Sequence, residues 1–361
     1  MDTTAKIFPD EAQKRPVSVF TGFLGSGKTT VLNHLMAQPE LRETLVLINE
    51  FGAIGLDHHL VTFSREDTVV EMANGCLCCT IRSDLLKTLS QAMGRFSRGG
   101  VPWFKRVAIE PTGLADPAPV LQLLMREPTI TRHYRLDGVI TTVDGVNGMD
   151  TLDRHGEAVK QAAVADRLLV TKADLAAPDT LAALLTRLRA LNPAATLRVV
   201  RNGAVEPAAV LNVGLYNPQT KSLDVQNWLQ AEAYGEDHHH HHHDHSHGHH
   251  HHNDVNRHDA HIQALCLTVD EPFTPGVLDR WLGVLRDLRG PDLLRLKGMV
   301  NVVGYDGPLI LQGVQHVLHP LAVLDAWPTD DRRSHLVFIT RDIPPGALEK
   351  TLALARQEAS G

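Results

Sequence analysis

The sequence predicts an α/β fold in which a doubly wound, mostly parallel sheet is followed by a smaller C-terminal α+β domain. Two observations predict this fold. From Pro16 to Val200, short runs rich in Val, Ile and Leu alternate with helical stretches, which is typical of a parallel sheet covered by helices on both faces. After a segment rich in histidine, a second pattern begins at His261, in which several strands follow one another without helices between them.

The runs expected to form strands in the first part lack polar alternation, as strands buried on both faces do. The predicted strands are Val17–Phe20, Thr44–Ile48, Thr68–Met72, Arg106–Ile109, Gly138–Val143, Arg167–Thr171 and Thr196–Val200. The predicted helices are Thr29–Gln38, Ser83–Phe96, Pro119–Arg126, Arg154–Ala165 and Thr180–Leu191. Because strands and helices alternate, the strands are expected to run parallel.

The second pattern predicts an α+β domain over residues 261–361. Its expected strands are His261–Val269, Leu293–Gly304, Pro308–Leu318 and Leu336–Thr340, and its expected helices are Pro275–Leu288 and Pro345–Arg356. Residues 230–260 contain almost nothing to bury, so a disordered linker is expected there. A flexible extension over residues 1–15 and a first domain over residues 16–229 complete the predicted organisation.

Composition excludes several classes of protein. The chain has 361 residues, of which 43% are hydrophobic, enough for two ordinary cores. No apolar run reaches the ~18 residues of a membrane span, and the first residues lack the apolar stretch of a secretory signal. The formal net charge is −7 and there is no basic stripe, which argues against nucleic acid as a partner. We therefore expect a cytoplasmic protein with no membrane and no nucleic-acid partner.

A glycine-rich sequence, GFLGSGKTT, stands between the first predicted strand and the first predicted helix. This is the P-loop pattern, in which glycines let several backbone N–H groups point at an anion beside a helix N-terminus. Lys28 is expected to reach the β- and γ-phosphates of a nucleotide, and the Thr29 hydroxyl to bind Mg²⁺. The alternative is a glycine-rich turn without a ligand. The residues expected to bind nucleotide here are Gly22, Gly25, Ser26, Gly27, Lys28, Thr29 and Thr30.

The sequence Thr171-Lys172-Ala173-Asp174 follows a later predicted strand and is expected to read the base. A carboxylate at Asp174 accepts hydrogen bonds from N1–H and the exocyclic amine of guanine, whereas adenine presents an acceptor at N1. The stem of Lys172 is expected to stack on the base. Thr171 stands where Asn is usual and lacks the amide that ties this loop down, so a weakened preference for guanine is expected. The alternative is a polar strand end in which Asp174 is an ordinary loop residue.

The sequence EPTG, from Glu110 to Gly113, ends another predicted strand, at the edge where ligands of parallel sheets bind. Glu110 is expected to hold Mg²⁺ through water or to orient the attacking water, and Gly113 to offer its N–H to the γ-phosphate. With Lys28 and Thr29, these are the expected catalytic residues. The alternative is a plain turn with a solvated Glu110. Asp144, which precedes a glycine at a further strand end, predicts a turn.

Three of the four cysteines fall close together, at Cys76, Cys78 and Cys79. Adjacent cysteines pair poorly with each other, and clustered thiols in a cytosolic chain indicate a metal site or a redox group. Thiolates bind Zn²⁺, Cu(I) or Co²⁺, and a site of three thiolates keeps a coordination position open for transfer. Buried small side chains and a redox pair are the alternatives. Cys266 alternates within a predicted strand and is expected in the core.

Twelve of the 22 histidines lie between His238 and His252. Such a flexible tract is expected to bind several metal ions without fixing their geometry. Because the tract is internal and is interrupted by Asp, Ser and Gly, a purification tag explains it poorly.

Together these motifs resemble the CobW-like P-loop GTPases, a family of metal chaperones. The resemblance covers most of the chain and rests on the P-loop, on the sequence NEFG from Asn49, on the C-x-C-C loop, and on the EPTG and TKAD sequences. In the second domain it includes RLKG from Arg295 and QGVQH from Gln312.

The resemblance implies a GTPase with slow intrinsic activity that binds GTP and Mg²⁺. It also implies delivery of a divalent ion, Zn²⁺ or alternatively Co²⁺, to a client metalloprotein or an enzyme of a metal-cofactor pathway. Glu50 follows the second strand, where P-loop GTPases place a switch, and is expected to be a carboxylate of the Mg²⁺ site or of the metal site. The alternative is a solvated loop charge. The second domain resembles the partner-binding or regulatory module of the family, in which His316 is expected to be a structural strand residue. The oligomeric state stays open.

The expected mechanism is a switch in which GTP and Mg²⁺ order the loops around Glu50 and Glu110, complete the thiol site, and release the ion after hydrolysis. No catalytic Gln or Arg finger is evident, so a client is expected to supply the missing group. Two alternatives stay open: a metal buffer or sensor in which the histidine tract stores ions and GTP is secondary, and cobalt delivery to cobalamin synthesis. A metabolic P-loop kinase needs an acceptor-site motif, and none is found.

Overall fold

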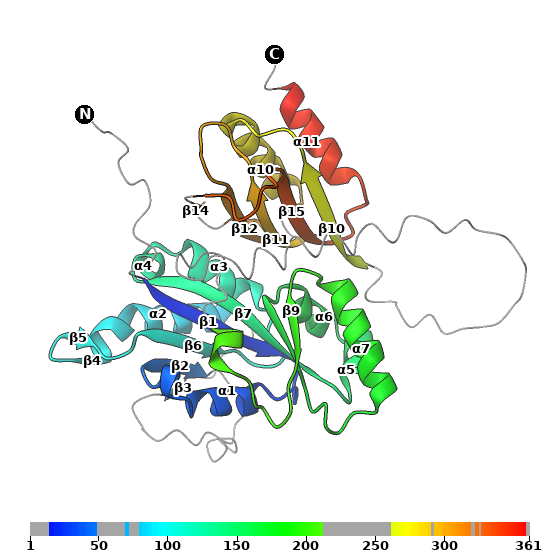
Figure 1. Cartoon of the computed structure of the whole chain (residues 1–361). Helices are drawn as coiled ribbons and strands as arrows, with labels where there is room; N and C mark the ends of the chain where they lie inside the picture. The colour runs from blue at the N-terminus through cyan, green and yellow to red at the C-terminus, as the bar shows by residue number, and fades with distance from the viewer. Residues whose placement is uncertain are drawn as a thin grey trace, which may run out of the picture.

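The computed structural model describes residues 14–48, 69–71, 79–211, 261–289, 292–318, 322–324 and 326–358. Within these residues, two large sheets, each with its own helices, lie one above the other (Figure 1). The predicted linker and most of the predicted N-terminal extension lie outside the described residues, so the domain boundaries stay predictions. None of the helices in the described residues has the length and apolar composition that a membrane-spanning segment requires.

The first sheet has seven strands in the order β3-β2-β6-β1-β7-β8-β9, and every neighbouring pair is parallel. The strands are β1 (Arg15–Gly22), β2 (Thr44–Ile48), β3 (Val69–Glu71), β6 (Arg106–Glu110), β7 (Tyr134–Asp144), β8 (Arg167–Thr171) and β9 (Thr196–Val199). All seven coincide with predicted strands, since runs of Val, Ile and Leu suit strands buried on both faces. The predicted fold class is therefore confirmed.

Helices cover both faces of this sheet. They are α1 (Lys28–Met36), α2 (Cys79–Arg95), α3 (Ala118–Arg126), α4 (Pro128–Thr131), α5 (Gly148–Arg154), α6 (Gly156–Ala163), α7 (Pro178–Leu191) and α8 (Pro207–Val210). Successive side chains of β8 point to opposite faces: Leu169 packs in the cluster that contains α1, whereas Leu168 and Val170 pack with α6 and α7. No sequence pattern predicted the short segments η2 (Pro39–Leu41), β4 (Ser97–Arg98) and β5 (Val101–Pro102).

The second sheet is antiparallel, in the order β10-β15-β11-β12-β13, with β14 paired to β12. Its elements are β10 (Ile262–Val269), α10 (Pro275–Arg289), β11 (Leu293–Val300), β12 (Leu309–Val314), β13 (Val317–Leu318), β14 (Ala322–Val323), β15 (Ser334–Arg341) and α11 (Ala347–Gln357). Helices α10 and α11 pack on one face of this sheet around the buried Trp281.

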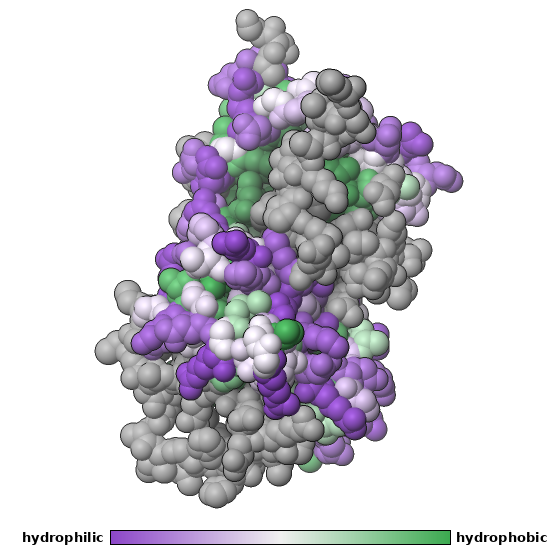
Figure 2. Space-filling model, turned by 90° about the vertical axis from the view of Figure 1, so that its left-hand side faces the viewer, coloured by the Kyte–Doolittle hydropathy of each residue, from purple (hydrophilic) through white to green (hydrophobic). Residues whose placement is uncertain are grey.

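The other face of the second sheet contacts the first domain. Leu294, Val314 and Ile339 share one apolar cluster with residues of β1, α2 and α3. A hydrogen bond of 2.7 Å joins the amide of Gln122 in α3 to the side-chain oxygen of Gln315. On the face seen in Figure 2, hydrophilic side chains prevail among the coloured residues of the lower, first domain, and larger apolar areas lie on the upper, second domain.

Three details differ from the sequence predictions. The helix expected over Arg154–Ala165 is α6, which begins only at Gly156 because His155 has extended backbone angles, and α5 before it was not predicted. The strand expected over Pro308–Leu318 is split into β12 and β13 by a turn in which Gln315 has a φ of 53°. His316 therefore lies in a turn, and its prediction as a strand residue is wrong.

Cys266 is exposed, so its prediction as a core residue is also wrong. Successive residues of a strand face opposite sides, and in β10 it is Leu267 and Val269 that pack in the apolar cluster of the second domain. Cys266 therefore faces away from that core.

Candidate functional site

The P-loop joins β1 to α1 at the carboxyl edge of the first sheet. Gly22, Gly25 and Gly27 all have positive φ values, of 137°, 70° and 87°. At Gly22, a Cβ atom would lie 2.4 Å from the backbone oxygen of Thr142 in β7, so the close approach of the two strands requires glycine here. The predicted glycine-rich loop has the backbone conformation that an anion-binding nest requires.

Polar side chains form hydrogen bonds within and beside this loop. The buried Lys28 ammonium donates hydrogen bonds to the backbone oxygens of Gly22, at 3.0 Å, and Phe23, at 3.2 Å. The hydroxyls of Ser26 and Thr142 lie 2.7 Å apart. These contacts place the ammonium of Lys28 against the loop that would surround the phosphates.

Thr29 and Glu110 meet beside the loop. The Thr29 hydroxyl donates a hydrogen bond of 2.8 Å to Oε1 of Glu110. Thr29 is the second residue of α1 and Glu110 is the last residue of β6, the strand next to β1. A hydroxyl and a carboxylate are the hard oxygen ligands that Mg²⁺ prefers, so this pair fits the predicted Mg²⁺ position.

The loop after Glu110 packs directly on the P-loop. A Cβ atom at Gly113 would lie 2.7 Å from the backbone nitrogen of Leu24, so only glycine fits at this distance. From the other side, the amide of Gln161 in α6 donates hydrogen bonds to the backbone oxygens of Gly113, at 3.0 Å, and Ala115, at 3.1 Å. Gly113 is thus held between the P-loop and α6.

Thr171 at the end of β8 ties the predicted base loop to the P-loop. Its hydroxyl lies 2.7 Å from the backbone oxygen of Ser26 and 3.3 Å from that of Val143. The sequence predicted that replacing Asn by Thr would lose this tie. In the structure the Thr171 hydroxyl itself attaches this loop to the P-loop, and the expected weakening of the preference for guanine stays a prediction.

Lys172 and Asp174 follow at the same edge. Lys172 has a left-handed backbone with a φ of 53°, and its ammonium donates a hydrogen bond of 2.7 Å to Oδ2 of Asp144 at the end of β7. Burial raises the pKa of Asp144, but the bonds from Lys172 and from Asn147 and Val146 outweigh burial, so this pKa lies below its usual value. Asp174 is exposed, as a residue that meets a ligand from solvent has to be.

Residues 16–198 match the family described as CobW/HypB/UreG, nucleotide-binding domain, and residues 262–356 match the cobalamin synthesis protein cobW C-terminal domain. The chain belongs to the CobW/HypB/UreG family. It is 28% identical over 341 residues to the zinc chaperone YjiA of Escherichia coli, a match that spans 94% of this chain and 98% of that protein. It is 29% identical over 329 residues to the zinc chaperone CobW of Sinorhizobium sp, spanning 83% and 85% of the two chains.

A solved structure agrees with this assignment. The zinc(II)-bound triple mutant of the YjiA GTPase is similar with a TM-score of 0.64 at 25% identity, covering 96% of this chain and 98% of that one. The predicted family and the predicted P-loop GTPase class are therefore confirmed.

The metal site expected in this CobW-family chain lies almost wholly outside the described residues. Glu50, Cys76 and Cys78 lie outside them, as does the histidine tract, and Cys79 is known only as the first residue of α2. Among the residues that the structure does describe, no group of three or more His, Cys, Asp or Glu side chains suits a metal ion. The thiol site stays a prediction.

Sequence reasoning missed three features at the carboxyl edge of the first sheet, where the P-loop and the predicted base loop lie and which is called the nucleotide edge below. One is the turn from Arg201 to Ala204 after β9, where Gly203 lies against Thr30 of α1; its Asn-Gly pair after a strand was the available signal. The second is the Asp144–Lys172 pair, since the sequence indicated only a turn at Asp144. The third is Gln161, for which helical periodicity gives no signal.

A cavity of about 210 Å³ lies between the P-loop, the end of β7, α5 and α6. Its lining includes Phe23, Thr142, Leu152, Gln161 and Lys172. The cavity is thus bounded by both the phosphate loop and the predicted base loop.

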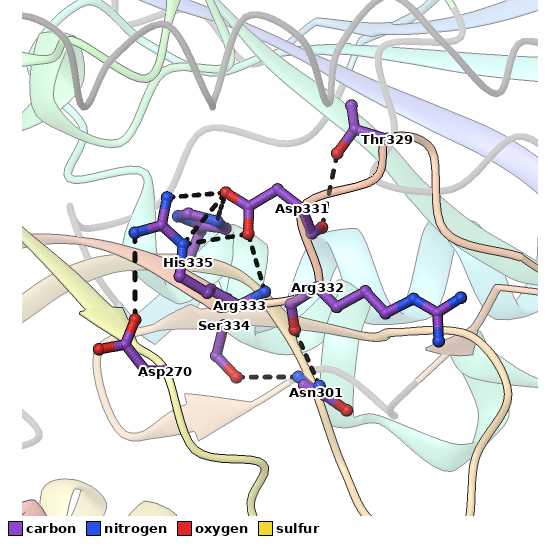
Figure 3. A network of polar contacts seen from close by, with 8 residues as sticks. All are labelled: Asp270, Asn301, Thr329, Asp331, Arg332, Arg333, Ser334 and His335. Carbon is purple, nitrogen blue, oxygen red and sulfur yellow. Dashed lines mark hydrogen bonds and ion pairs between the residues drawn. The ribbon is translucent and has the colours of Figure 1, made fainter.

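A further polar network lies in the second domain, before β15 (Figure 3). Asp331 accepts hydrogen bonds from the backbone and guanidinium of Arg333 and lies 3.1 Å from Nε2 of His335. These contacts, chiefly those of Arg333, lower the pKa of Asp331. The Ser334 hydroxyl accepts a hydrogen bond from the Asn301 backbone. The network joins the start of β15 to the end of β11, which indicates a structural role.

Proposed function

We propose that this chain is a GTP-dependent zinc chaperone that binds a divalent transition metal at Cys76, Cys78 and Cys79 and delivers it to a client metalloprotein when GTP is hydrolysed. Membership of a GTPase family and similarity to two proteins named zinc chaperones support the proposal. The observation that carries it is the 2.8 Å contact between Thr29 and Glu110, which brings the two predicted Mg²⁺ groups together beside the P-loop.

Each residue at the phosphate end has a separate task in the proposed reaction. The P-loop N–H groups and Lys28 bind the β- and γ-phosphates, because partly positive N–H groups and an ammonium lie together at the N-terminus of α1 and attract an anion. When bound at Thr29, Mg²⁺ supplies charge that stabilises the transferred phosphoryl group. Glu110 orients the attacking water or holds the Mg²⁺ shell, and the Gly113 N–H binds a γ-phosphate oxygen.

At the base end, the proposal assigns guanine recognition to Asp174 and base stacking to Lys172. The contact of Asp144 with the Lys172 ammonium supports this assignment, because it fixes the lysine stem at the edge where Asp174 is exposed. The hydroxyl contacts of Thr171 support a loop that stays attached to the P-loop.

The zinc ion is the cargo in this proposal. Glu50 and the three thiols lie between β2 and the start of α2 along the chain, and EPTG follows β6, the neighbour of β2. The carboxyl ends of parallel strands meet at one edge, so the cargo site and the phosphate site are expected to be neighbours. GTP binding and metal binding are then coupled, and each ligand strengthens the other by the same factor.

The coupling is tested by measuring Zn²⁺ affinity of the full chain with GTP–Mg²⁺, with GDP–Mg²⁺ and without nucleotide. The affinity is expected to be about 5- to 150-fold higher with GTP than with GDP. Replacing Cys78 and Cys79 together by Ser should remove the tight ion and the coupling and keep GTP binding. Cys266→Ser is the matched control, since this exposed cysteine lies in the second domain. Equal Zn²⁺ affinity in both nucleotide states excludes the switch.

The GTPase assignment is tested with Lys28→Ala. Turnover and nucleotide binding should be lost while the circular dichroism spectrum is unchanged, because the ammonium donates to the backbone of Gly22 and Phe23 within the phosphate-binding loop. GTP turnover at the wild-type rate contradicts the P-loop assignment. ATP turnover equal to GTP turnover in the wild-type chain contradicts the role of Asp174.

A second function, a metal buffer or sensor, is favoured by the tract between His238 and His252. In a chaperone, deleting this tract removes several weak ions and keeps one tight ion. The weak binding should fade below about pH 6.5, since protons compete for imidazole nitrogen. Loss of the tight ion with the tract favours the buffer. Repeating the titration with Co²⁺ distinguishes zinc delivery from cobalt delivery to cobalamin synthesis.

A further inference from the structure

Gln161 is a fully buried polar side chain, 0% exposed, that none of the steps above uses. It lies on α6, and both hydrogens of its amide are donated to one loop, to the backbone oxygens of Gly113 at 3.0 Å and Ala115 at 3.1 Å. A backbone oxygen has no hydrogen to donate, so the amide nitrogen has to face this loop and the amide oxygen has to face away. Among the described residues, Oε1 of Gln161 accepts no hydrogen bond.

A buried acceptor without a partner destabilises the folded chain. An apolar side chain of similar volume would avoid this penalty but would leave two backbone oxygens of the loop without donors. The hydrogen bonds of the Gln161 amide therefore all go to the loop, and its oxygen has no hydrogen-bond partner among the described residues.

Neighbouring contacts fix α6 against the same loop. Lys160 lies 3.2 Å from Oδ2 of Asp116, whose Oδ1 accepts a hydrogen bond of 3.0 Å from the Ala118 backbone at the start of α3. The Thr141 hydroxyl of β7 donates a hydrogen bond of 2.8 Å to the Gln161 backbone oxygen. The helix that carries Gln161 is thus attached to the sheet and positions the loop from a fixed base.

The opposite side of the loop is the P-loop. Gly113 packs against Leu24 so closely that a side chain at position 113 would clash. The backbone of Gly113 is therefore confined between Leu24 on one side and the Gln161 amide on the other. The N–H that the proposed function assigns to the γ-phosphate is on this residue.

We propose that Gln161 is a positioning residue for GTP hydrolysis, which holds the loop from Gly113 to Asp116 so that the Gly113 N–H meets the γ-phosphate. This inference rests on the proposed function. It concerns the γ-phosphate alone, because neither Gly113 nor Ala115 belongs to the predicted base loop or to the residues expected to hold the β-phosphate. Gln161 therefore distinguishes GTP from GDP and does not contribute to binding the shared part of the two nucleotides.

The test compares the affinity of the full chain for a non-hydrolysable GTP analogue with its affinity for GDP. Gln161→Glu keeps the shape of the side chain but turns carboxylate oxygens toward two backbone oxygens. The affinity for the analogue and the kcat for GTP should each fall about tenfold, the effect of losing one or two hydrogen bonds. The affinity for GDP should change less than about twofold.

Asn192→Leu is the matched control. Asn192 is also a buried amide, and its nitrogen donates to the backbone oxygens of Ala162, Ala163 and Ala165, at and just after the C-terminal end of α6. The variant therefore loosens the helix end that carries Gln161 and keeps the contacts of Gln161 with the loop. Its loss should lower the melting temperature and leave the ratio of analogue affinity to GDP affinity unchanged. A change of that ratio as large as in Gln161→Glu overturns the assignment to Gln161.

Lys160→Met provides a second variant, because the pair of Lys160 with Asp116 is partly exposed and its loss leaves the core intact. It should lower the same affinity ratio by about two- to threefold, as expected for such a pair. An unchanged ratio in both variants overturns this inference while the proposed function stands. A wild-type chain that binds neither guanine nucleotide overturns the proposed function and this inference with it.

Discussion

Two aspartates lie at opposite ends of neighbouring strands and have opposite surroundings. Asp144 ends β7 at the nucleotide edge and pairs with Lys172, whose side chain is 37% exposed. Asp166 immediately precedes β8 at the other edge, is 2% exposed, and lies 2.7 Å from Arg295 and 2.6 Å from Lys297 of the second domain. Both are carboxylate–cation pairs, but only the first is open to a ligand.

The buried cluster is held from both domains. Asp166 exchanges hydrogen bonds with Val139, accepting from its backbone N–H at Oδ2, while Oδ1 faces the two cations of β11. Burial alone would raise the pKa of Asp166, but Arg295 and Lys297 outweigh burial and lower this pKa to about 2. The Asp166 cluster therefore joins the domains by an interaction that water does not weaken.

In this cluster one carboxylate contacts two cations, since Oδ1 of Asp166 lies beside both Arg295 and Lys297. Among the described residues, Nε and Nη1 of Arg295 have no hydrogen-bond partner, and burial together with the charge of Arg295 lowers the pKa of Lys297. The comparison teaches that burial decides what an Asp–cation pair does. A buried pair holds domains together, and a half-exposed pair presents a side chain to a ligand.

The largest expected effect that tests this contrast is that of Asp166→Asn. The variant removes the buried carboxylate that both Arg295 and Lys297 contact, so the free energy of unfolding should fall by about 3–5 kcal/mol. Denaturation with urea, followed by circular dichroism, measures it. Asp150→Asn is the control, since Asp150 forms an exposed pair with Arg154. A loss as small as that of Asp150→Asn contradicts the structural role of the cluster.

The pH dependence of stability should show the same cluster with a smaller effect. The pKa of Asp166 is lowered from 3.8 to about 2 in the folded chain. Between these values the unfolded chain binds a proton that folded Asp166 does not, so its contribution is present above about pH 4 and is lost as the pH falls toward 2. The loss amounts to about 2 kcal/mol. It is measured as the difference between wild type and Asp166→Asn, and a pH-independent difference contradicts it.

The smallest expected change in stability belongs to the pair at the nucleotide edge. Asp144→Asn should alter the free energy of unfolding by less than about 1 kcal/mol, because water screens the Lys172 ammonium. It should instead weaken GTP and GDP to the same extent, by about three- to tenfold, since the lysine stem loses its fixed position. Nucleotide titration measures both affinities. If Asp144→Asn lowers the free energy of unfolding and leaves the nucleotide affinity unchanged, Asp144 has a structural role and the contrast with Asp166 is wrong.

Local patterns made most of the first domain predictable. Apolar runs located all seven strands of its sheet, and glycine spacing located the P-loop. Because parallel strands end at one edge, the sequence order also indicated that Thr29 and Glu110 share a site, and they lie in contact. The short helix α5 was not predicted, and the turn at His316 was not predictable, since Gln315 and His316 are not typical turn residues.

Amino-acid sequence by itself determined the family, the fold class and the residue types at the phosphate edge, because each depends on spacing within a short segment. Tertiary structure alone decided the roles of Gln161, Asp144 and Asp166. Their partners lie 48, 28 and 129 residues away along the chain. The sequence pattern around a polar side chain in an apolar helix or strand is the same whether that side chain is solvated or paired. Only folding brings its partner within hydrogen-bond distance.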